Sequence, residues 1–180
     1  MRYILILLLS IQLFADLKEE MLIQYKNSEF ESVCTQGSQN FSKYRKDEEF
    51  ISLYAFACLY SDHINKLSIP MIVLKNSSES RANSAYLSIV LMQEKLLKHA
   101  LIDDYELTAF TLPSTDYILS KVFDMYAKMG KHAKQDFYVF QDSKDKNLSY
   151  KLYLEKTSKG LSIAIDEISN NQTIKHHIFY

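Results

Sequence analysis

The amino-acid sequence predicts an α+β protein in which N-terminal helical hairpins pack on a C-terminal four-stranded antiparallel β-meander. Two observations carry this prediction. Up to Gly130, apolar residues recur at the three- and four-residue spacing of helices. From Asp136 onward they alternate with polar residues, as in strands that bury one face. A sheet with one apolar face must cover it, and the preceding helices are the available cover.

The chain divides into three expected segments: a signal peptide at 1–15, a helical region at 16–130 and an antiparallel β region at 131–180. The 180 residues include the export segment, so the mature chain has the size of one domain. We therefore expect the β region to pack on the helices as part of the same domain.

The first residues, MRYILILLLSIQLFA, have the layout of a secretory signal peptide. Arg2 supplies the positive start, Tyr3 to Phe14 supply a short apolar core, and Ala15 supplies the small residue before a cleavage site. The apolar run is shorter than the roughly 20 residues that span a membrane. We expect cleavage after Ala15 and a periplasmic mature protein, and the alternative is an uncleaved N-terminal anchor.

Capping residues and apolar spacing predict the helices. Ser28 and Glu31 form a capping box before a helix that runs to Tyr44. A second helix follows Asp47, and it is apolar most of the way round, so it should be central. The others are a short piece at 62–67 that ends before Pro70, a long helix opened by Asn76 and Glu79 that continues to Leu101, and a last helix opened by Pro113 and Ser114 and stopped by Gly130.

Four strands are predicted, at 136–142, 149–156, 161–168 and 173–180, with turn-like connectors between them. The alternation places a set of apolar side chains on the face toward the helices: Tyr150, Leu152, Leu154, Leu161, Ile163 and Ile165.

The two cysteines, Cys34 and Cys58, are expected to form a disulfide. Cys34 lies eleven residues before a predicted turn at Arg45 and Lys46, and Cys58 lies twelve after it. These positions share one height in an antiparallel helical hairpin, and an exported chain keeps disulfides oxidised. The alternative is two buried free thiols. The chain has no Cys-x-x-Cys, so we interpret the disulfide as structural.

Composition and motifs argue against several function classes. The formal net charge is −1 without clustered Lys and Arg, so neither nucleic acid nor, after signal cleavage, a membrane is expected as partner. We find no P-loop, dinucleotide-binding glycine pattern, nucleophile elbow or His-Glu-x-x-His helix. We therefore predict no cofactor, no metal ligands and no catalytic residues, which favours a non-enzymatic protein over an enzyme.

Two pairs of neighbouring side chains, each with a histidine, are candidates for chemistry. His99 and Asp103 lie one helical turn apart and could share a proton or a cation, although such pairs are common on solvated helix faces. His176 and His177 are adjacent in a predicted strand, so they point to opposite faces and cannot readily hold one metal. An aromatic end residue such as Tyr180 also occurs in outer-membrane barrels, but those need at least about eight strands.

The segment DKNLS, from Asp145 to Ser149, fits the bacterial N-glycosylation pattern, with an acid two residues before Asn and Ser two residues after it. It lies in a predicted hairpin loop of an exported protein, which makes Asn147 a candidate glycosylation site. The alternative is a polar turn that matches by chance.

The signal peptide, the Lys- and Ile-rich composition and the segment RANSAYLSIVLMQEKLLKHALID resemble uncharacterised periplasmic proteins of campylobacter-type bacteria. The resemblance covers most of the mature chain and brings no assigned activity. Phe30 to Asp62 also resembles a helix pair of a tetratricopeptide-like repeat, with Gly37 and Ala57 as small packing residues. We find one copy, whereas such arrays need about three, so the resemblance implies a partner-binding helical hairpin and not a solenoid.

Three function classes remain. The first is a non-enzymatic envelope protein that binds another envelope protein through a Tyr-rich helix surface or a free sheet edge. The second is a periplasmic binder of a small ligand, with a pocket between sheet and helices. The third is an envelope enzyme without a recognisable motif. The absence of motifs favours the first class, and the oligomeric state is left open.

Overall fold

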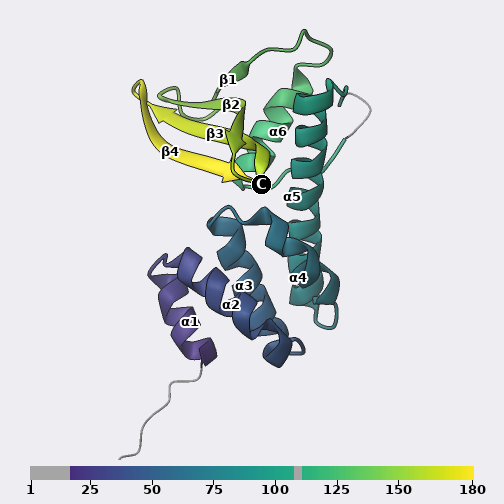
Figure 1. The fold of residues 1–180 in the computed structure, drawn as a ribbon, viewed down its shortest axis with the longest axis vertical. Coiled ribbons are helices and arrows are strands. Elements are labelled where there is room, and N and C mark those ends of the chain that lie inside the picture. The colour runs from purple at the N-terminus through teal and green to yellow at the C-terminus, as the bar shows by residue number, and fades with distance from the viewer. Residues whose placement is uncertain (1–16, 108–110) are drawn as a thin grey trace, which may run out of the picture.

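The computed structural model describes residues 17–107 and 111–180, and the predicted signal peptide at 1–15 lies outside them. Helices precede a four-stranded sheet (Figure 1), which confirms the predicted α+β class. The helices are α1 (Leu17–Lys26), α2 (Phe30–Tyr44), α3 (Glu48–Tyr60), a 3-10 helix η1 (Ile64–Leu67), α4 (Ser68–Val73), α5 (Ser78–Asp103) and α6 (Ile118–Lys128). The strands are β1 (Phe137–Gln141), β2 (Leu148–Thr157), β3 (Gly160–Ser169) and β4 (Gln172–Phe179). Within the described ranges, no helix is both long and apolar enough to cross a bilayer.

Helices α2 and α3 form the predicted hairpin, with Arg45 and Lys46 in the connection. Asp47 caps α3, because its carboxylate accepts hydrogen bonds from the backbone N–H groups of Glu49 and Phe50, both at 3.1 Å. The cap places the start of the most apolar helix directly after the turn.

A disulfide between Cys34 and Cys58 closes the far end of this hairpin, which confirms the predicted pairing. The sulfur atoms are 2.06 Å apart and the Cα atoms 4.7 Å apart, as a disulfide requires. Midway along the hairpin, Gly37 lies so close to Tyr54 that an added Cβ would come within 2.4 Å of its ring. The missing side chain of Gly37 and the disulfide together allow the two helices to approach closely.

The predicted capping box of α2 is wrong. Ser28 has a left-handed φ of 63°, and its backbone N–H donates to the carbonyl of Tyr25 at 3.0 Å, which completes the turn after α1. Helix α2 begins at Phe30 without a side-chain cap. Glu31 instead lies 2.7 Å from the Nε2 atom of His63, beyond the end of α3. Helix α1 itself was not predicted, since its apolar residues follow no clear period.

Two further helix starts differ from the prediction. Helix α5 is capped by Ser77, one residue after the predicted Asn76, because the Ser77 hydroxyl accepts from the N–H of the third residue of α5 at 3.0 Å. Helix α6 begins at Ile118 and not at Pro113 and Ser114, since the residue before Ile118 is still extended. Both helices otherwise occupy the predicted segments.

Pro70 lies inside α4, whereas the sequence predicted that the short helical piece ends before it. Pro70 is the third residue of α4, in the first turn, where a backbone N–H has no helical partner to lose. Helical structure therefore continues through η1 and α4 as far as Val73.

The strands pair in the order β1-β2-β3-β4, and every pair is antiparallel, as a meander requires. Leu152 lies opposite Ile165, and Leu154 lies opposite Ile163. Leu152, Ile163 and Ile165 are fully buried and Leu154 is partly buried in the core, so the predicted inner face is confirmed for these four residues.

Leu161 was predicted on the same face, but it is 45% exposed. The last pairing of β4 joins Phe179 to Ile163, so Leu161 lies beyond the end of β4, next to the turn at Gly160. No strand covers Leu161 on that side within the described residues.

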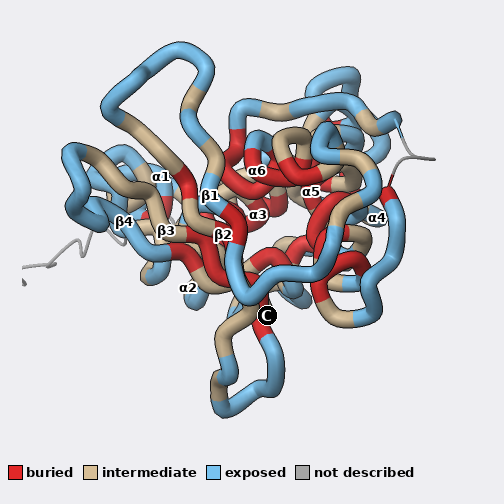
Figure 2. The backbone as a smooth tube through the Cα atoms, turned by 90° about the horizontal axis from the view of Figure 1, so that it is seen from above, coloured by how far each residue is buried: buried red, intermediate tan, exposed pale blue. Residues whose placement is uncertain are grey.

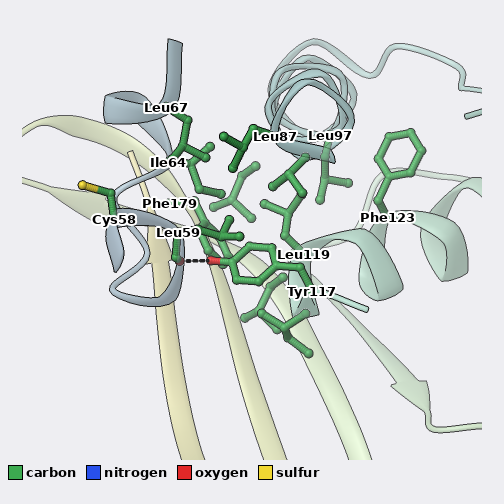
Figure 3. Close-up of a cluster of buried hydrophobic side chains, with 14 of the residues drawn as sticks. Cys58, Leu59, Ile64, Leu67, Leu87, Leu97, Tyr117, Leu119, Phe123 and Phe179 are labelled. Atoms are coloured by element: carbon green, nitrogen blue, oxygen red, sulfur yellow. Dashed lines mark hydrogen bonds between the residues drawn. The ribbon is translucent and has the colours of Figure 1, made fainter. Parts of the chain in front are cut away.

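The core lies where the helices meet the inner face of the sheet (Figure 2). Side chains from α3, η1, α5, α6 and β4 gather there (Figure 3), among them Leu59, Ile64, Leu67, Leu87, Leu97, Leu119, Phe123 and Phe179. Tyr117 adds its ring, and its hydroxyl donates to the carbonyl of Leu59 at 2.9 Å. The polar tip of this buried ring is therefore satisfied.

Replacing Ile163 by Lys should lower the free energy of unfolding by about 4 kcal/mol, because the change buries an unpaired charge. Ile163 is fully buried, whereas Ile174 in β4 is 61% exposed, so Ile174→Lys is the matched control and should change stability little. Denaturant unfolding of both variants tests the assignment of sheet faces. Wild-type stability in Ile163→Lys would contradict it.

Removing the disulfide by the double substitution Cys34→Ala and Cys58→Ala should cost about 3 kcal/mol of unfolding free energy, because the bond closes a loop with a sequence separation of 24. A reducing agent should destabilise the wild type to a similar degree and leave the double variant unchanged. Alkylation of the unreduced protein, followed by mass spectrometry, should label neither cysteine. Two labelled thiols would refute the disulfide.

Candidate functional site

The open face of α3 forms the floor of a groove with a volume of about 870 Å³. Four side chains that fall on one side of the helix mark this face, and we call them the α3 stripe: Ser52, Leu53, Phe56 and Tyr60. Ser52, Leu53 and Phe56 are partly exposed, and Tyr60 is 41% exposed. The groove along the stripe, which we call the α3 groove, has Tyr25 of α1, three residues of the stripe and polar residues of both helix starts in its lining, and Tyr60 is not part of it. The lining residues are Tyr25, Lys46, Asp47, Glu48, Glu49, Ser52, Leu53, Phe56, Asn76, Ser77, Glu79, Ser80 and Asn83.

The stripe is unusual because α3 has almost no polar residues with which to face water. From Phe50 to Tyr60 the helix reads FISLYAFACLY, and Ser52 is its one polar residue apart from the tyrosine hydroxyls. A helix that is apolar all round is normally buried all round. The sides of α3 that face α2 and the core are buried, while the stripe is left partly open.

Aromatic rings continue the stripe onto the neighbouring helices. The Tyr25 ring of α1 lies 6.3 Å from Tyr60, and Phe30 lies 5.2 Å from Tyr60. Phe56 lies 6.3 Å from Tyr60 and 5.7 Å from Tyr86 of α5. These centroid distances are those of interacting aromatic pairs, so α1, α3 and α5 share one aromatic surface.

Carboxylates gather at the end of the groove where α3 begins. Lys18 of α1 lies 3.1 Å from Asp47 and 2.8 Å from Glu49. The Glu48 carboxylate accepts backbone N–H bonds from the loop before α5, from Lys75 and Asn76 at 2.8 Å and from Ser77 at 3.1 Å. These hydrogen bonds, led by those from Asn76 and Lys75, lower the pKa of Glu48 to about 2. The carboxylate therefore fixes the start of α5 against the start of α3.

A second polar cluster, which we call the Asp62 joint, consists of Asp62, Tyr117, Glu167 and His177. Asp62 follows α3 with a left-handed φ of 62° and accepts a hydrogen bond from the Tyr117 hydroxyl at 2.7 Å. Its other carboxylate oxygen lies 2.8 Å from Nδ1 of His177, whose Nε2 lies 3.0 Å from Glu167. His177 is 2% exposed. The joint links the end of α3 to the start of α6 and to strands β3 and β4.

Burial and charge act in opposite directions on His177. Burial by itself lowers the pKa of the imidazole, but hydrogen bonding to Asp62, the charge of Asp62 and the hydrogen bond to Glu167 outweigh it, so the pKa is raised. The pKa of Tyr117 is raised well above its usual range, chiefly by burial and then by the Asp62 charge. His177 is thus stabilised as a cation and Tyr117 as a neutral donor.

Next to the joint lies a cleft of about 200 Å³, which Tyr60 connects to the α3 stripe. The Tyr86 hydroxyl donates to Asp116 at 2.7 Å, and Lys121 and Lys175 complete the polar lining. The cleft is smaller than the roughly 300–1,000 Å³ of typical ligand sites. Its central polar groups bond to one another and so link the helices to the sheet.

The structure separates the histidines singled out in the sequence. His99 lies on an exposed part of α5, 3.8 Å from Asp103, and its ring stacks on Tyr105 at 4.3 Å, outside both the groove and the cleft. His176 lies 2.6 Å from Asp166, whereas His177 belongs to the Asp62 joint. The described residues contain no group of three His, Cys, Asp or Glu side chains placed to hold a metal.

Asn147 is exposed in the turn between β1 and β2. Its backbone N–H donates to the carboxylate of Asp145 at 2.9 Å, so the acid of the candidate glycosylation motif also shapes the turn. Tyr180, at the opposite end of the sheet, lies under the Lys159 ammonium at 4.0 Å.

Asp62, Tyr117 and Glu167 were not predicted as a cluster. The bond from Asp62 to His177 spans 115 residues, and no local pattern reports so distant a contact. The alternation of side chains along β4 was the available signal for a buried His177, because it places His177 on the same face as the buried Phe179. The sequence analysis also missed the open side of α3, because a helix with so few polar residues is predicted to be buried on all sides.

The sheet offers a second exposed surface, on the face away from the core. Phe137 is 50% and Val139 is 58% exposed, and the Lys151 ammonium lies over the rings of Phe137 and Tyr153 at 4.9 and 5.0 Å. A cation therefore lies over the aromatic rings of this surface, although Phe137 stays half exposed.

Comparison with known protein families, with curated proteins and with solved structures found no match to this chain.

His177 should make stability depend on pH. Because its folded pKa is raised, its stabilising contribution is complete below the unfolded value of about 6.5 and is lost as pH rises through the folded pKa. His177→Gln should therefore lower stability more at pH 6 than at pH 9, and denaturant unfolding across this range measures the difference. His99→Gln, on an exposed part of α5, is the control. An equal loss at both pH values would show that the imidazolium is not the stabilising form.

Proposed function

We propose that this protein is a non-enzymatic protein of the bacterial envelope that binds another envelope protein through the α3 groove. The observation that carries the proposal is the aromatic α3 stripe, which is partly exposed on a helix with almost no polar residues. Partly exposed apolar and aromatic side chains around a groove are a common basis of protein recognition. The sequence of residues 1–15 supports export, and the Cys34–Cys58 disulfide suits an oxidising compartment.

A periplasmic small-ligand binder is the second candidate. The cleft beside the Asp62 joint favours it, because Tyr60, Tyr86, Lys121 and Asp116 converge there between helices and sheet. Its small volume and the internal pairing of Tyr86 with Asp116 make it the weaker candidate. The envelope enzyme is weaker again, since His99 and Asp103 line neither the α3 groove nor the cleft beside the Asp62 joint.

We also propose Asn147 as a glycosylation site. Its exposed position in a turn supports access by a modifying enzyme, and its motif has the required leading acid and following Ser149. The peptide mass of tryptic Asn147 fragments from the native envelope tests this directly.

Affinity purification of the tagged protein from the native envelope tests the proposed function. One envelope protein should co-purify with the wild type and, in the reciprocal purification, should retain this chain. Phe56→Lys should lose that partner, because it places a charge in the stripe, while Val139→Lys on the outer sheet should keep it. Both variants must melt like the wild type. A partner retained by Phe56→Lys, or no partner with the wild type, would contradict the proposal.

The same material tests export. N-terminal sequencing of the purified protein should begin at Asp16. A sequence that begins at Met1 would contradict cleavage.

A further inference from the structure

We infer that His177 is a pH-sensitive switch, in which the charged imidazole holds the Glu167 carboxylate and the neutral imidazole releases it to Lys175. None of these three residues lines the α3 groove, so the inference goes beyond the proposed function and does not depend on it. Three features support it: two carboxylates on one buried ring, the unequal attachment of these carboxylates, and a second cation opposite Glu167.

Both ring nitrogens of His177 face a carboxylate. Nδ1 lies 2.8 Å from Asp62, and Nε2 lies 3.0 Å from Glu167. Two hydrogen bonds to carboxylates need two N–H donors, which only the imidazolium has. A neutral ring would turn a lone pair toward one of the carboxylates, and His177 is too deeply buried for water to screen the repulsion. Loss of the proton therefore breaks one of the two contacts.

Asp62 is attached more firmly than Glu167. The Asp62 carboxylate also accepts a hydrogen bond from the Tyr117 hydroxyl at 2.7 Å. Among the described residues, the Glu167 carboxylate hydrogen-bonds to His177 alone, and its side chain is 22% exposed, so it can turn into the cleft. The neutral ring should therefore keep its proton on Nδ1, bonded to Asp62, and release Glu167.

Lys175 is placed to receive the released carboxylate. It is the partner of Glu167 in the register of β3 and β4, and both residues line the cleft beside the Asp62 joint. Side chains directly opposite each other on antiparallel strands are close enough to interact. In the part of the chain that the structure describes, Lys175 makes no ion pair, so its ammonium group is available.

The charges around the ring act in both directions. Burial and the charge of Lys175 lower the pKa of His177, whereas Asp62 and Glu167 raise it, and the net shift is upward. The effect of Lys175 on this pKa shows that its ammonium group lies near the ring.

The other ionisable groups nearby have partners or lie on other elements. Tyr150 of β2 lies opposite Glu167, but its hydroxyl donates to Asp142 at 2.6 Å. The remaining ionisable residues that line the cleft are Tyr60 of α3, Tyr86 of α5, Asp116 before α6 and Lys121 of α6. Asp116 accepts from the Tyr86 hydroxyl, which leaves Lys121 as the other ammonium group of the cleft lining.

The exchange would change the cleft and leave the attachment of the sheet in place. His177 stays bonded to Asp62 in both states, so β4 remains linked to the end of α3. Lys175 is an unpaired cation of the cleft while His177 is charged, and it becomes half of an ion pair when His177 is neutral. The cleft should then attract anions less strongly as pH rises.

Nitrogen-15 NMR of the protein with labelled histidine tests which contact breaks. The spectrum of His177→Gln identifies the His177 signals by their absence. Both nitrogens of His177 should carry protons below the titration midpoint, and above it Nε2 should lose its proton while Nδ1 keeps it. A neutral ring with its proton on Nε2, or no titration of His177 before the protein unfolds, would overturn the inference.

Crystal structures at a pH below and a pH above that midpoint test the exchange itself. At the higher pH, the Glu167 carboxylate should lie within about 4 Å of Nζ of Lys175 and should have left Nε2 of His177. A Glu167 carboxylate that stays on His177, or that pairs with Lys121, would contradict the exchange.

Matched variants measure the contribution of Lys175. Lys175→Met and Lys121→Met each remove one exposed cation of the cleft, but only Lys175 lies opposite Glu167. Lys175→Met should raise the pKa of His177 more than Lys121→Met does, because it also removes the partner that stabilises the neutral state. Glu167→Gln should lower the pKa of His177, since one carboxylate is lost. Equal shifts in the two lysine variants would show that Lys175 is not the second partner.

Discussion

The apolar character of α3 is the constraint on which the helical region depends. Nearly every side chain from Phe50 to Tyr60 favours a position away from water, so neighbours must cover the helix on several sides. Helix α2, which the disulfide joins to α3, covers one side. On another side, Leu59 of α3 packs into the core beneath the sheet. Helices α1 and α5 flank the remaining side without closing over it, which leaves the stripe as the part of α3 that this chain covers only in part.

The Asp62 joint connects this helical region to the sheet. Asp62 lies where α3 ends, in a backbone conformation that glycine adopts more readily, and its two carboxylate oxygens contact Tyr117 and His177. Replacement by glycine would relax the backbone and remove the link between α3, α6 and β4. The polar side chains around the adjacent cleft also bond to one another, as His177 does to Glu167 and Tyr86 does to Asp116.

The local sequence pattern predicted most helices and strands, but it did not predict the contacts between residues that are far apart in sequence. The hairpin, its disulfide and the inner face of the sheet follow from spacing between residues that are close in sequence, as Cys34 and Cys58 or Leu152 and Ile165 are. The helix caps at Ser28 and Asn76 failed because several neighbouring polar residues could cap, and tertiary contacts such as those of Glu48 select among them. The groove depends on where α1 and α5 lie relative to α3, which no period of a single helix encodes.

The meander also has a kinetic consequence. Each strand pairs with the strand next to it in sequence, and the α2–α3 hairpin closes a short loop, so both units need little loop-closure entropy to form. The contact between Asp62 and His177 closes 115 residues and brings the two units together. We expect the α2–α3 hairpin and the β-meander to form independently and to dock late in folding. The docking step, and not strand pairing, should then limit the refolding rate.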